Sequence, residues 1–519
     1  MVRIFAVRSL AADVFATLDG IPTRPTLTLI LLALIAFGGV AAGSFNLDDY
    51  SLFVNPNIAN ADGWWRLWAP LQTRPLTNLT FWLNYQIGGR DAVGYQLVDL
   101  ALHLAAVLLL FDVLKRLTGS RAAFLAAAIF SVHPMQAEAV NYIFARGTLL
   151  SAVLCLASLH AWLRGRRWIA VAWFAAALLA KEECVAFPVV LLLLHWSTRR
   201  ARAELGAIAA MFGLSLTAGL RAMAAAAAIP GSGAGAGAAV TAWQYALAQG
   251  TAIPRYMRMV VLPWGFTPGP DLPVPARWVA ALGWAAVVGM CLFASRRFRN
   301  AGPGFFFLAG IVLLLPSSSI FPATDLAADR RMYLPMTAFA AALALLLERV
   351  DRRVVWAGLA VLAALSVQRT FVWHSEESLW TDAAAKAPRK LRPKIQLARA
   401  LPPGRALPLL EEAKTIAPAD PSPASEEGRI YLAGGDPARA LAEFGIALAL
   451  QPGNPQALNN RGVALLALGQ KDAARQDFAR ALAVDGCEYN ALANLKKMGA
   501  AVRPPSRCRF TQDEKRELE

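Results

Sequence analysis

The sequence contains few cysteines, and their spacing offers no metal site. Only five occur in 519 residues, with neither a CxxC motif nor a His-rich segment, so we expect no zinc site. Cys155, Cys184 and Cys291 lie in apolar runs, where cysteine behaves as a small core residue. Cys487 and Cys508 lie near the C-terminus, and we expect a disulfide between them if that region lies outside the cytoplasm.

The long apolar runs lack the alternation of β-strands, which argues against a membrane barrel. They last roughly 15–22 residues and are rich in Ala and Leu, the length that crosses a bilayer as a helix. The chain is 57% hydrophobic with a mean hydropathy of +0.43, whereas a soluble domain is about 45–50% apolar. These features predict a polytopic, helical membrane protein.

The net charge of +16 does not form a single basic patch, so no nucleic-acid partner is expected. The basic residues recur as short clusters between apolar runs, which is the positive-inside pattern of membrane proteins. These clusters contain Lys115, Arg116 and Arg121; Arg164, Arg166 and Arg167; Arg199, Arg200 and Arg202; Arg296, Arg297 and Arg299; and Arg349, Arg352 and Arg353.

The clusters predict a topology with the N-terminus in the cytoplasm and the C-terminal region outside. The expected spans are 25–43, 97–114, 122–133, 147–163, 168–180, 184–198, 205–222, 278–295, 304–321, 333–348 and 354–369. The outer face then receives 44–96, 134–146, 181–183, 223–277, 322–332 and the residues after 370. We expect no cleavable signal peptide, because the first apolar run starts late and is long enough to span.

The region after residue 385 repeats with a period of 34 residues. Gly428, Tyr431, Gly435, Ala440, Phe444, Ala447 and Pro452 correspond to Gly462, Leu465, Gly469, Ala474, Phe478, Ala481 and Gly486. This is the tetratricopeptide (TPR) period, and a weaker unit precedes these two. Such units stack into a curved solenoid that either binds polypeptides or serves as a structural cap or oligomerisation surface.

Charged residues gather near the ends of the spans on the predicted outer face. They are Asp48, Asp49, Arg74, His133, Glu138, Arg146, Lys181, Glu182, Glu183, Asp325, Asp329, Arg330 and Arg331. Carboxylates supply a general base, and Arg and Lys neutralise a phosphate. The alternative is a set of interfacial ion pairs with no chemistry.

Two further outer segments favour the membrane interface. Aromatic residues of GWWRLW from Gly63, followed by Phe81, Trp82 and Tyr85, predict amphipathic helices lying in the membrane interface, which either contact the lipid donor or form an aromatic belt with no substrate role. The segment AIPRYMRMVVLPWGF from Ala252 is interrupted by Pro254 and Arg255, so it predicts an interfacial or re-entrant helix. The preceding AAAAAIPGSGAGAGAA is low in complexity and is expected to be a loop.

The order of short motifs resembles the transmembrane and TPR repeat-containing protein O-mannosyltransferases, within the GT-C glycosyltransferases. The motifs are LDDYSLFVNPNI from Leu47, RPLTNLTFWLNY from Arg74, HPMQAEAV from His133, KEECVAFPVVLLL from Lys181, RYMRMVVLPWGF from Arg255, ADRRMYLP from Ala328 and WHSEESLW from Trp373. The resemblance implies an all-α fold, with a GT-C-type transmembrane helical bundle followed by a TPR solenoid.

The resemblance also implies roles for particular residues. Asp48 would be the general base, with Asp49 as its neighbour and possible substitute. The donor would be a polyprenyl-phosphate-linked sugar, used without a metal or other cofactor, and the acceptor a Ser or Thr hydroxyl of an exported protein. The residues expected to bind the donor are Arg74, Lys181, Arg330 and Arg331, followed by Arg146, Arg255, His133, Glu138, Glu182 and Tyr333.

Two positions depart from the family pattern. Gln136 stands where a second His is expected, and Thr148 where an Asp is expected, so the sugar can differ from mannose. The composition favours a bacterial inner-membrane protein with its loops and repeats in the periplasm. An undecaprenyl carrier and a pilin or other exported acceptor, bound in the TPR groove, would follow.

The predicted organisation has five parts. They are an N-terminal arm (1–24), a transmembrane domain (25–370) with its first outer loop (44–96), a connecting helix (371–386), TPR repeats (387–500) and a tail (501–519). Two other functions fit the same sequence: transfer of the sugar to a lipid or cell-envelope glycan, and a membrane scaffold without enzymatic activity. A transporter is less favoured, because the charges cluster at span ends instead of within spans.

Overall fold

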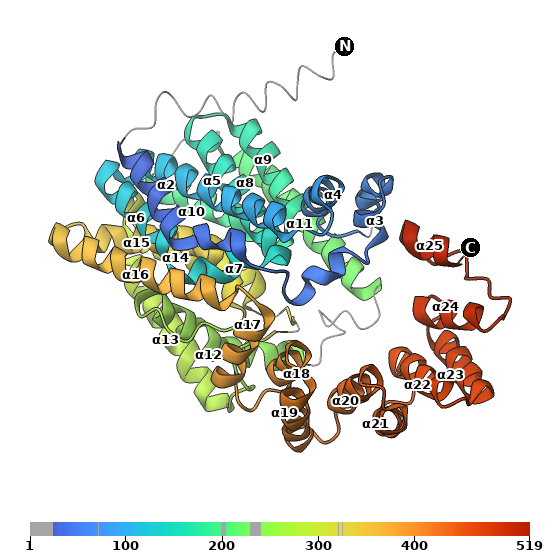
Figure 1. The fold of residues 1–519 in the computed structure, drawn as a ribbon. Helices are drawn as coiled ribbons and strands as arrows, with labels where there is room; N and C mark the ends of the chain where they lie inside the picture. The colour runs from blue at the N-terminus through green and yellow to red at the C-terminus, as the bar shows by residue number, and fades with distance from the viewer. Residues whose placement is uncertain are drawn as a thin grey trace, which may run out of the picture.

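The computed structural model describes residues 24–70, 72–198, 204–228, 240–319, 321–323 and 325–518. Within these ranges every regular element is a helix, as the sequence predicts (Figure 1). Most of the predicted N-terminal arm, the cluster at Arg199–Arg202 and most of the low-complexity segment lie outside the described residues. The transmembrane domain contains α2 (Arg24–Phe37), α3 (Pro56–Ala59), α4 (Pro75–Gly88), α5 (Ala92–Thr118), α6 (Ser120–Val132), α7 (Ala137–Asn141), α8 (Arg146–Leu163), α9 (Arg167–Ala180), α10 (Phe187–Thr198), α11 (Leu205–Ala228), α12 (Ala242–Val261), α13 (Arg277–Ser295), α14 (Pro303–Leu314), α15 (Tyr333–Leu347) and α16 (Arg352–Val372).

A helix lies at each of the eleven predicted spans. Among the described helices, seven are long and apolar enough to cross a membrane, and an eighth arises if the bent pair α6–α7 is one span. The helices α9 and α14 are apolar but shorter. The chain is therefore a multi-pass membrane protein, with an Ala- and Leu-rich core whose small side chains let the helices approach closely.

The helix that starts at Ser120 breaks at His133, and this break builds part of the outer face. Pro134 follows directly, and a residue before proline is disfavoured in the helical region. The backbone of His133 is extended, and the two halves meet at a bend of 52°. The short helix α7 then lies across the end of the bundle, where it carries Glu138 and leads to Tyr142.

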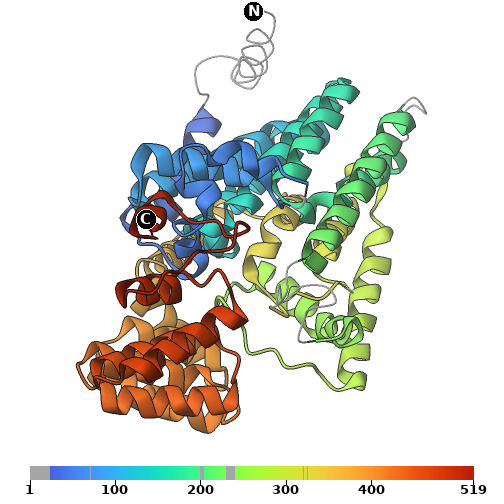
Figure 2. The ribbon, with the colours of Figure 1, turned by 90° about the vertical axis from the view of Figure 1, so that its right-hand side faces the viewer.

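The segment predicted as an interfacial or re-entrant helix forms the second half of α12, which continues through Pro254. This helix packs against α13 at two glycines, and Figure 2 shows this part of the bundle in light green. A Cβ atom built on Gly283 would lie 1.7 Å from the carbonyl oxygen of Gly250. Since no larger residue fits this crossing, the two glycines determine how closely α12 approaches the bundle.

The C-terminal region forms a curved array of paired helices (Figure 1). They are α17 (Glu376–Lys386), α18 (Leu391–Ala400), α19 (Pro403–Ile416), α20 (Ser422–Ala433), α21 (Pro437–Leu450), α22 (Pro455–Ala467), α23 (Lys471–Val484) and α24 (Tyr489–Lys497). The repeat has a direct structural cause: a Cβ on Gly428 would lie 2.8 Å from the ring of Phe444, and one on Gly462 would lie 2.6 Å from the ring of Phe478. The predicted TPR solenoid is thus confirmed.

The last residues return to the first outer loop and connect the far end of the solenoid to the bundle. A disulfide joins Cys487 to Cys508, with 5.3 Å between the Cα atoms. Asn60 in the first loop donates to the carbonyl oxygen of Phe510 at 3.4 Å and accepts from the backbone N–H of Gln512 at 3.0 Å. Helix α25 (Gln512–Leu518) therefore lies beside α3, although about 450 residues separate them (Figure 1).

Candidate active site

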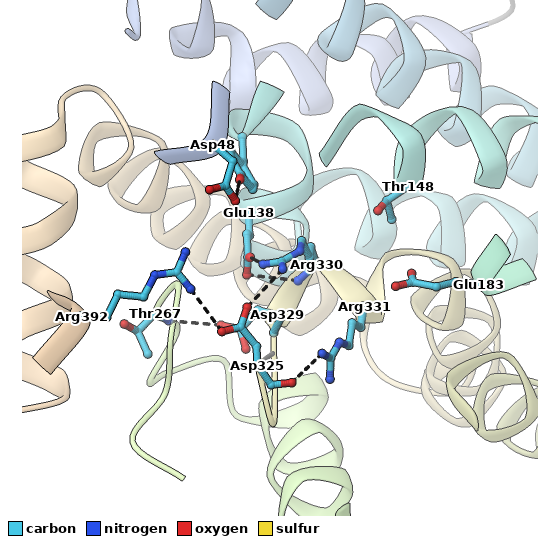
Figure 3. Close-up of polar contacts among 12 residues, drawn as sticks. Asp48, Glu138, Thr148, Glu183, Thr267, Asp325, Asp329, Arg330, Arg331 and Arg392 are labelled. Atoms are coloured by element: carbon cyan, nitrogen blue, oxygen red, sulfur yellow. Dashed lines mark hydrogen bonds and ion pairs between the residues drawn. The ribbon is translucent and has the colours of Figure 1, made fainter. Parts of the chain in front are cut away.

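A polar cavity of about 220 Å³ lies among the loops that connect the helices on the predicted outer face. Four segments distant in sequence contribute its charged side chains, and Figure 3 shows three of these segments at Asp48, Glu183 and residues 325–331. The charged and hydrogen-bonding residues that line it are Asp48, Arg74, Thr77, Asn78, Tyr142, Thr148, Lys181, Glu183, Asp325, Arg330 and Arg331. A base and several cations therefore share one cavity.

The two adjacent acids of the first loop point in different directions. They belong to the 3₁₀ helix η2 (Leu47–Leu52). Asp49 is fully buried, and its carboxylate accepts from the backbone N–H groups of Asn46 at 2.9 Å and Phe144 at 2.7 Å. Burial raises the pKa of Asp49 well above its usual range, although these two N–H groups lower it. Asp49 therefore ties the first loop to the second.

Asp48 is exposed and lines the cavity. Its Oδ2 accepts from the hydroxyl of Tyr142 at 2.8 Å, while its Oδ1 accepts no hydrogen bond from the described residues. Burial and the nearby Asp48 carboxylate raise the pKa of Tyr142, so the hydroxyl remains protonated and donates. Of the two acids, only Asp48 has a free carboxylate oxygen facing the cavity.

The ring of Tyr142 packs against the end of α16 and the guanidinium of Arg330. Its ring stacks on that of Trp373, with 5.7 Å between the centroids, and the guanidinium of Arg330 lies 5.9 Å from the Tyr142 ring centroid. Trp373 is buried at the end of α16, just before the connecting helix α17. The ring contacts fix the hydroxyl that orients Asp48.

Arg74 and Glu182 form a bidentate ion pair between the first and third outer loops. The guanidinium donates to the two carboxylate oxygens at 3.0 and 2.5 Å. Burial alone would raise the pKa of Glu182, but the Arg74 charge lowers it to about 2. Arg74 also has a left-handed backbone with φ of 53° directly before Pro75, and the pair helps to hold this strained conformation.

Lys181 lies in the same loop and is nearly buried. Its Nζ donates to Thr148 Oγ1 at 2.7 Å and lies 2.8 Å from Glu183. Burial lowers the pKa of Lys181, although Glu183 raises it. The residue that departs from the family pattern, Thr148, is thus a direct neutral partner of a cavity cation.

Arg330 and Arg331 lie near the end of the fifth outer loop, in the 3₁₀ helix η11 (Asp329–Met332). Arg330 donates to Glu138 at 2.5 Å and to Asp325 at 3.3 Å. Arg331 makes no ion pair within the described part of the chain. It donates to the hydroxyl of Tyr245 at 2.9 Å and to the backbone oxygen of Asp325 at 2.7 Å. Arg331 is therefore the cavity cation whose charge is least neutralised.

Arg146, predicted to bind the donor, does not line the cavity. It is fully buried and donates to Asp99 at 2.6 Å, to Asn84 Oδ1 at 2.5 Å and to the backbone oxygen of Tyr95 at 2.9 Å. Its guanidinium also lies over the ring of Phe81. These contacts use its donors to join α4, α5 and α8, so the structure places Arg146 in the scaffold of the site.

Three other predicted donor residues also lie outside the cavity lining. Arg255 pairs with Asp329 at 2.8 Å, joining α12 to η11. His133 accepts from the backbone N–H of Met135 on Nδ1, so its Nε2 carries the proton and donates to the Val260 oxygen at 3.2 Å. Tyr333 bonds to His103 at 2.9 Å in the core. Each has its polar atoms occupied by structural partners.

Glu138 and Glu182 do not line the cavity, but each forms an ion pair with an arginine that does: Glu138 with Arg330 and Glu182 with Arg74. Conversely, Tyr142 and Asn78 line the cavity but were not singled out from the sequence. Asn78 belongs to the motif that starts at Arg74, and Tyr142 lies two residues after the motif that starts at His133, so their nearness to these motifs was the available signal. Among the described residues, no group of three or more His, Cys, Asp or Glu side chains is arranged to hold a metal ion.

Comparisons with known proteins show which families this chain is similar to. The family described as dolichyl-phosphate-mannose-protein mannosyltransferase matches residues 70–220, and the tetratricopeptide repeat family matches residues 425–490. A protein O-mannosyl-transferase of Caenorhabditis elegans is 24% identical over 416 residues, which cover 73% of this chain and 60% of the relative. The Tmtc1 protein O-mannosyl-transferase of Drosophila melanogaster is 40% identical over 120 residues, covering 22% of this chain and 14% of the relative.

The crystal structure of ArnT from Cupriavidus metallidurans, bound to undecaprenyl phosphate, matches with a TM-score of 0.38 and 14% identity, covering 87% of this chain and 79% of that chain. The predicted resemblance to the transmembrane and TPR repeat-containing protein O-mannosyltransferases is confirmed by the sequence matches. The chain spans 60% or less of the length of the two relatives described above.

Proposed function

We propose that this chain is a membrane glycosyltransferase that moves a sugar from a polyprenyl-phosphate donor to Ser or Thr hydroxyls of exported proteins. The observation that carries the proposal is the meeting, in one cavity, of four cations and an Asp48 carboxylate oxygen that has no hydrogen-bond partner in the described part of the chain. The Asp48 carboxylate oxygen suits a general base, and the four cations suit an anionic leaving group. The similarity to named O-mannosyl-transferases supports the same reaction class.

The reaction follows from these positions. The free oxygen of Asp48 takes the proton of the acceptor hydroxyl as its oxygen attacks the anomeric carbon. The bond between that carbon and the phosphate oxygen breaks, and the lipid phosphate leaves with the electron pair. Attack from the side opposite the phosphate inverts the anomeric configuration. Arg74, Lys181, Arg330 and Arg331 stabilise the negative charge on the leaving phosphate.

The finer assignments belong to the same proposal. The donor carrier is undecaprenyl phosphate, the membrane is a bacterial inner membrane, and the cavity and solenoid face the periplasm. The solenoid binds the acceptor polypeptide, because curved arrays of paired helices of this kind form extended concave binding surfaces (Figure 1). No metal participates in the proposed step, because the four cations supply the positive charge that the leaving phosphate requires.

The test is the intact mass of exported proteins from cells that carry the chain, compared with cells that carry Asp48→Asn. A sugar-sized increment should be present in the first and absent from the second. Asp62→Asn is the matched control, since Asp62 is an exposed acid of the same loop outside the cavity. If lipid or polysaccharide profiles change instead, the acceptor is wrong. If nothing changes, the chain is a scaffold.

A further inference from the structure

The repeat domain reaches the donor cavity through one carboxylate. Asp325 lies in the loop before η11, and its side chain is largely buried between two arginines. Its Oδ2 accepts from Arg330 at 3.3 Å, and its Oδ1 accepts from Arg392 at 3.3 Å. Figure 3 shows Arg392 approaching this carboxylate from the side opposite the cavity arginines. Arg392 belongs to α18, whereas Arg330 belongs to the transmembrane domain.

This contact is part of a docked interface between the two domains. Asp382 on α17 pairs with Arg369 at 2.7 Å and with Lys386 at 2.6 Å. Lys386 also donates to the backbone oxygen of Phe266 at 3.0 Å. These interactions hold α17 against the end of α16 and the loop after α12, and α18 follows after four residues. The position of Arg392 is therefore set by the way the solenoid sits on the bundle.

We propose that Arg392 is a positioning residue through which the repeat domain sets the affinity of the cavity for anionic lipid donors. The identity of the donor rests on the proposed function, but the affinity for a lipid phosphate is tested without any transfer reaction. Arg392 acts by drawing the Asp325 carboxylate away from Arg330, so that more of the Arg330 charge faces the cavity.

The balance of charge around Asp325 gives the direction of the effect. Two carboxylates, Glu138 and Asp325, surround the guanidinium of Arg330. With Arg330, Arg331 and Arg392 present, three positive and two negative groups give a net charge of +1. Without Arg392 the net charge of these groups is zero, and Arg330 is the remaining ion-pair partner of the Asp325 carboxylate among the described residues, with Lys390 at longer range. An entering phosphate then meets a weaker attraction.

One consequence concerns the order of events in the reaction. If an acceptor moves α18 away from the bundle, Arg392 leaves Asp325, and the affinity of the cavity for the spent lipid phosphate falls. The solenoid would then bind the acceptor and also promote release of the lipid product. This consequence depends on the same contact and is tested with the same variants.

The experiment measures binding of farnesyl phosphate, a short polyprenyl phosphate, to the purified full chain in detergent. Arg392→Gln should raise the Kd about two- to fivefold, the range of a partly exposed ion pair. Arg392→Lys keeps the positive charge and should bind nearly as well as the unaltered chain. Arg389→Gln is the matched control, because Arg389 is 82% exposed and pairs with Asp271, outside the cavity lining.

Asp325→Asn tests the route of the effect and has the opposite expected sign. The backbone oxygen that holds Arg331 remains, but the charge that neutralises Arg330 is lost, so the probe should bind more tightly. In the Asp325→Asn background, Arg392→Gln should have a smaller effect than in the unaltered chain, because only the long-range attraction between Arg392 and the probe is then lost. The proposal is overturned if the loss is equally large in that background, if Arg392→Lys binds as poorly as Arg392→Gln, or if Arg389→Gln gives an equal loss.

Failure of this inference is distinguishable from failure of the proposed function. If the Kd for the probe changes as expected in the Arg392 variants but no exported protein gains a sugar, the role of Arg392 in donor affinity stands and the acceptor assignment fails. If exported proteins are modified but Arg392→Gln leaves the Kd for the probe unchanged, the proposed transferase function stands and the role of Arg392 in donor affinity fails.

Discussion

Exchanging each of the two adjacent acids for its amide separates catalysis from stability. Asp48→Asn leaves the fold intact, because the amide oxygen still accepts from Tyr142 and the side chain is exposed. The change in unfolding free energy should stay within about 0.5 kcal/mol. The amide cannot take a proton, so turnover should fall by about 10² to 10⁴, the usual contribution of a general base. This corresponds to about 2.7–5.4 kcal/mol in the barrier.

Asp49→Asn should have the reverse profile. Both carboxylate oxygens accept backbone N–H bonds in a fully buried site, and an amide supplies one acceptor only. Leaving one N–H opposite an NH₂ group should cost about 1–3 kcal/mol of stability. Because burial raises the pKa of Asp49, its stabilising contribution is fully present below the usual pKa and declines as the pH rises through the raised value. The destabilisation should therefore be larger in acid than in alkali.

The assay uses the purified full chain in detergent, with transfer of labelled sugar to an acceptor peptide and thermal unfolding measured in parallel. Asp62→Asn serves as the control and should change neither quantity appreciably. The reasoning is refuted if Asp48→Asn retains turnover, or if Asp49→Asn abolishes turnover without lowering the unfolding temperature.

Three further predictions concern the cations and the repeats. Arg331→Gln should weaken polyprenyl-phosphate binding about tenfold or more in a titration, because this buried cation has no carboxylate partner among the described residues. Burial lowers the pKa of Lys181, so the affinity for phosphate should fall as the pH rises, at a pH below the usual lysine pKa. Folding stability should rise over the same pH interval, because the folded state binds fewer protons than the unfolded state. Lys181→Arg should abolish the decline in affinity. Gly462→Leu should destabilise the solenoid by about 1–3 kcal/mol in unfolding measurements, because its Cβ meets the Phe478 ring, whereas Gly453→Leu should not.

The helices could be located from sequence because their signals are local. The 34-residue repeat places Gly428 and Gly462 where the rings of Phe444 and Phe478 need room. The break at His133 follows from Pro134, which acts on the residue before it. Such features depend on neighbours a few residues away, and they appear in the structure where the pattern predicts them.

The candidate site was only partly predictable, because the same residue type has different roles at similar positions. Arg146 and Arg331 both stand near span ends, yet one is buried against Asp99 and the other lines the cavity. Composition and spacing describe them alike. Their partners come from elements far away in the chain, and only the packing of those elements separates a structural arginine from one that can meet a phosphate.

The sequence by itself determined that this chain is a helical membrane bundle followed by a repeat solenoid, with acids and bases at one end. Apolar length and periodicity decide these properties, and both are written along the chain. Tertiary structure alone decided that Asp48 and not Asp49 faces the cavity, since that depends on the backbone N–H of Phe144, 95 residues away. It also decided that Arg392 of the solenoid reaches Asp325 beside the cavity. The role of a charged side chain depends on the groups that it contacts, and groups distant in sequence come into contact only in the folded chain.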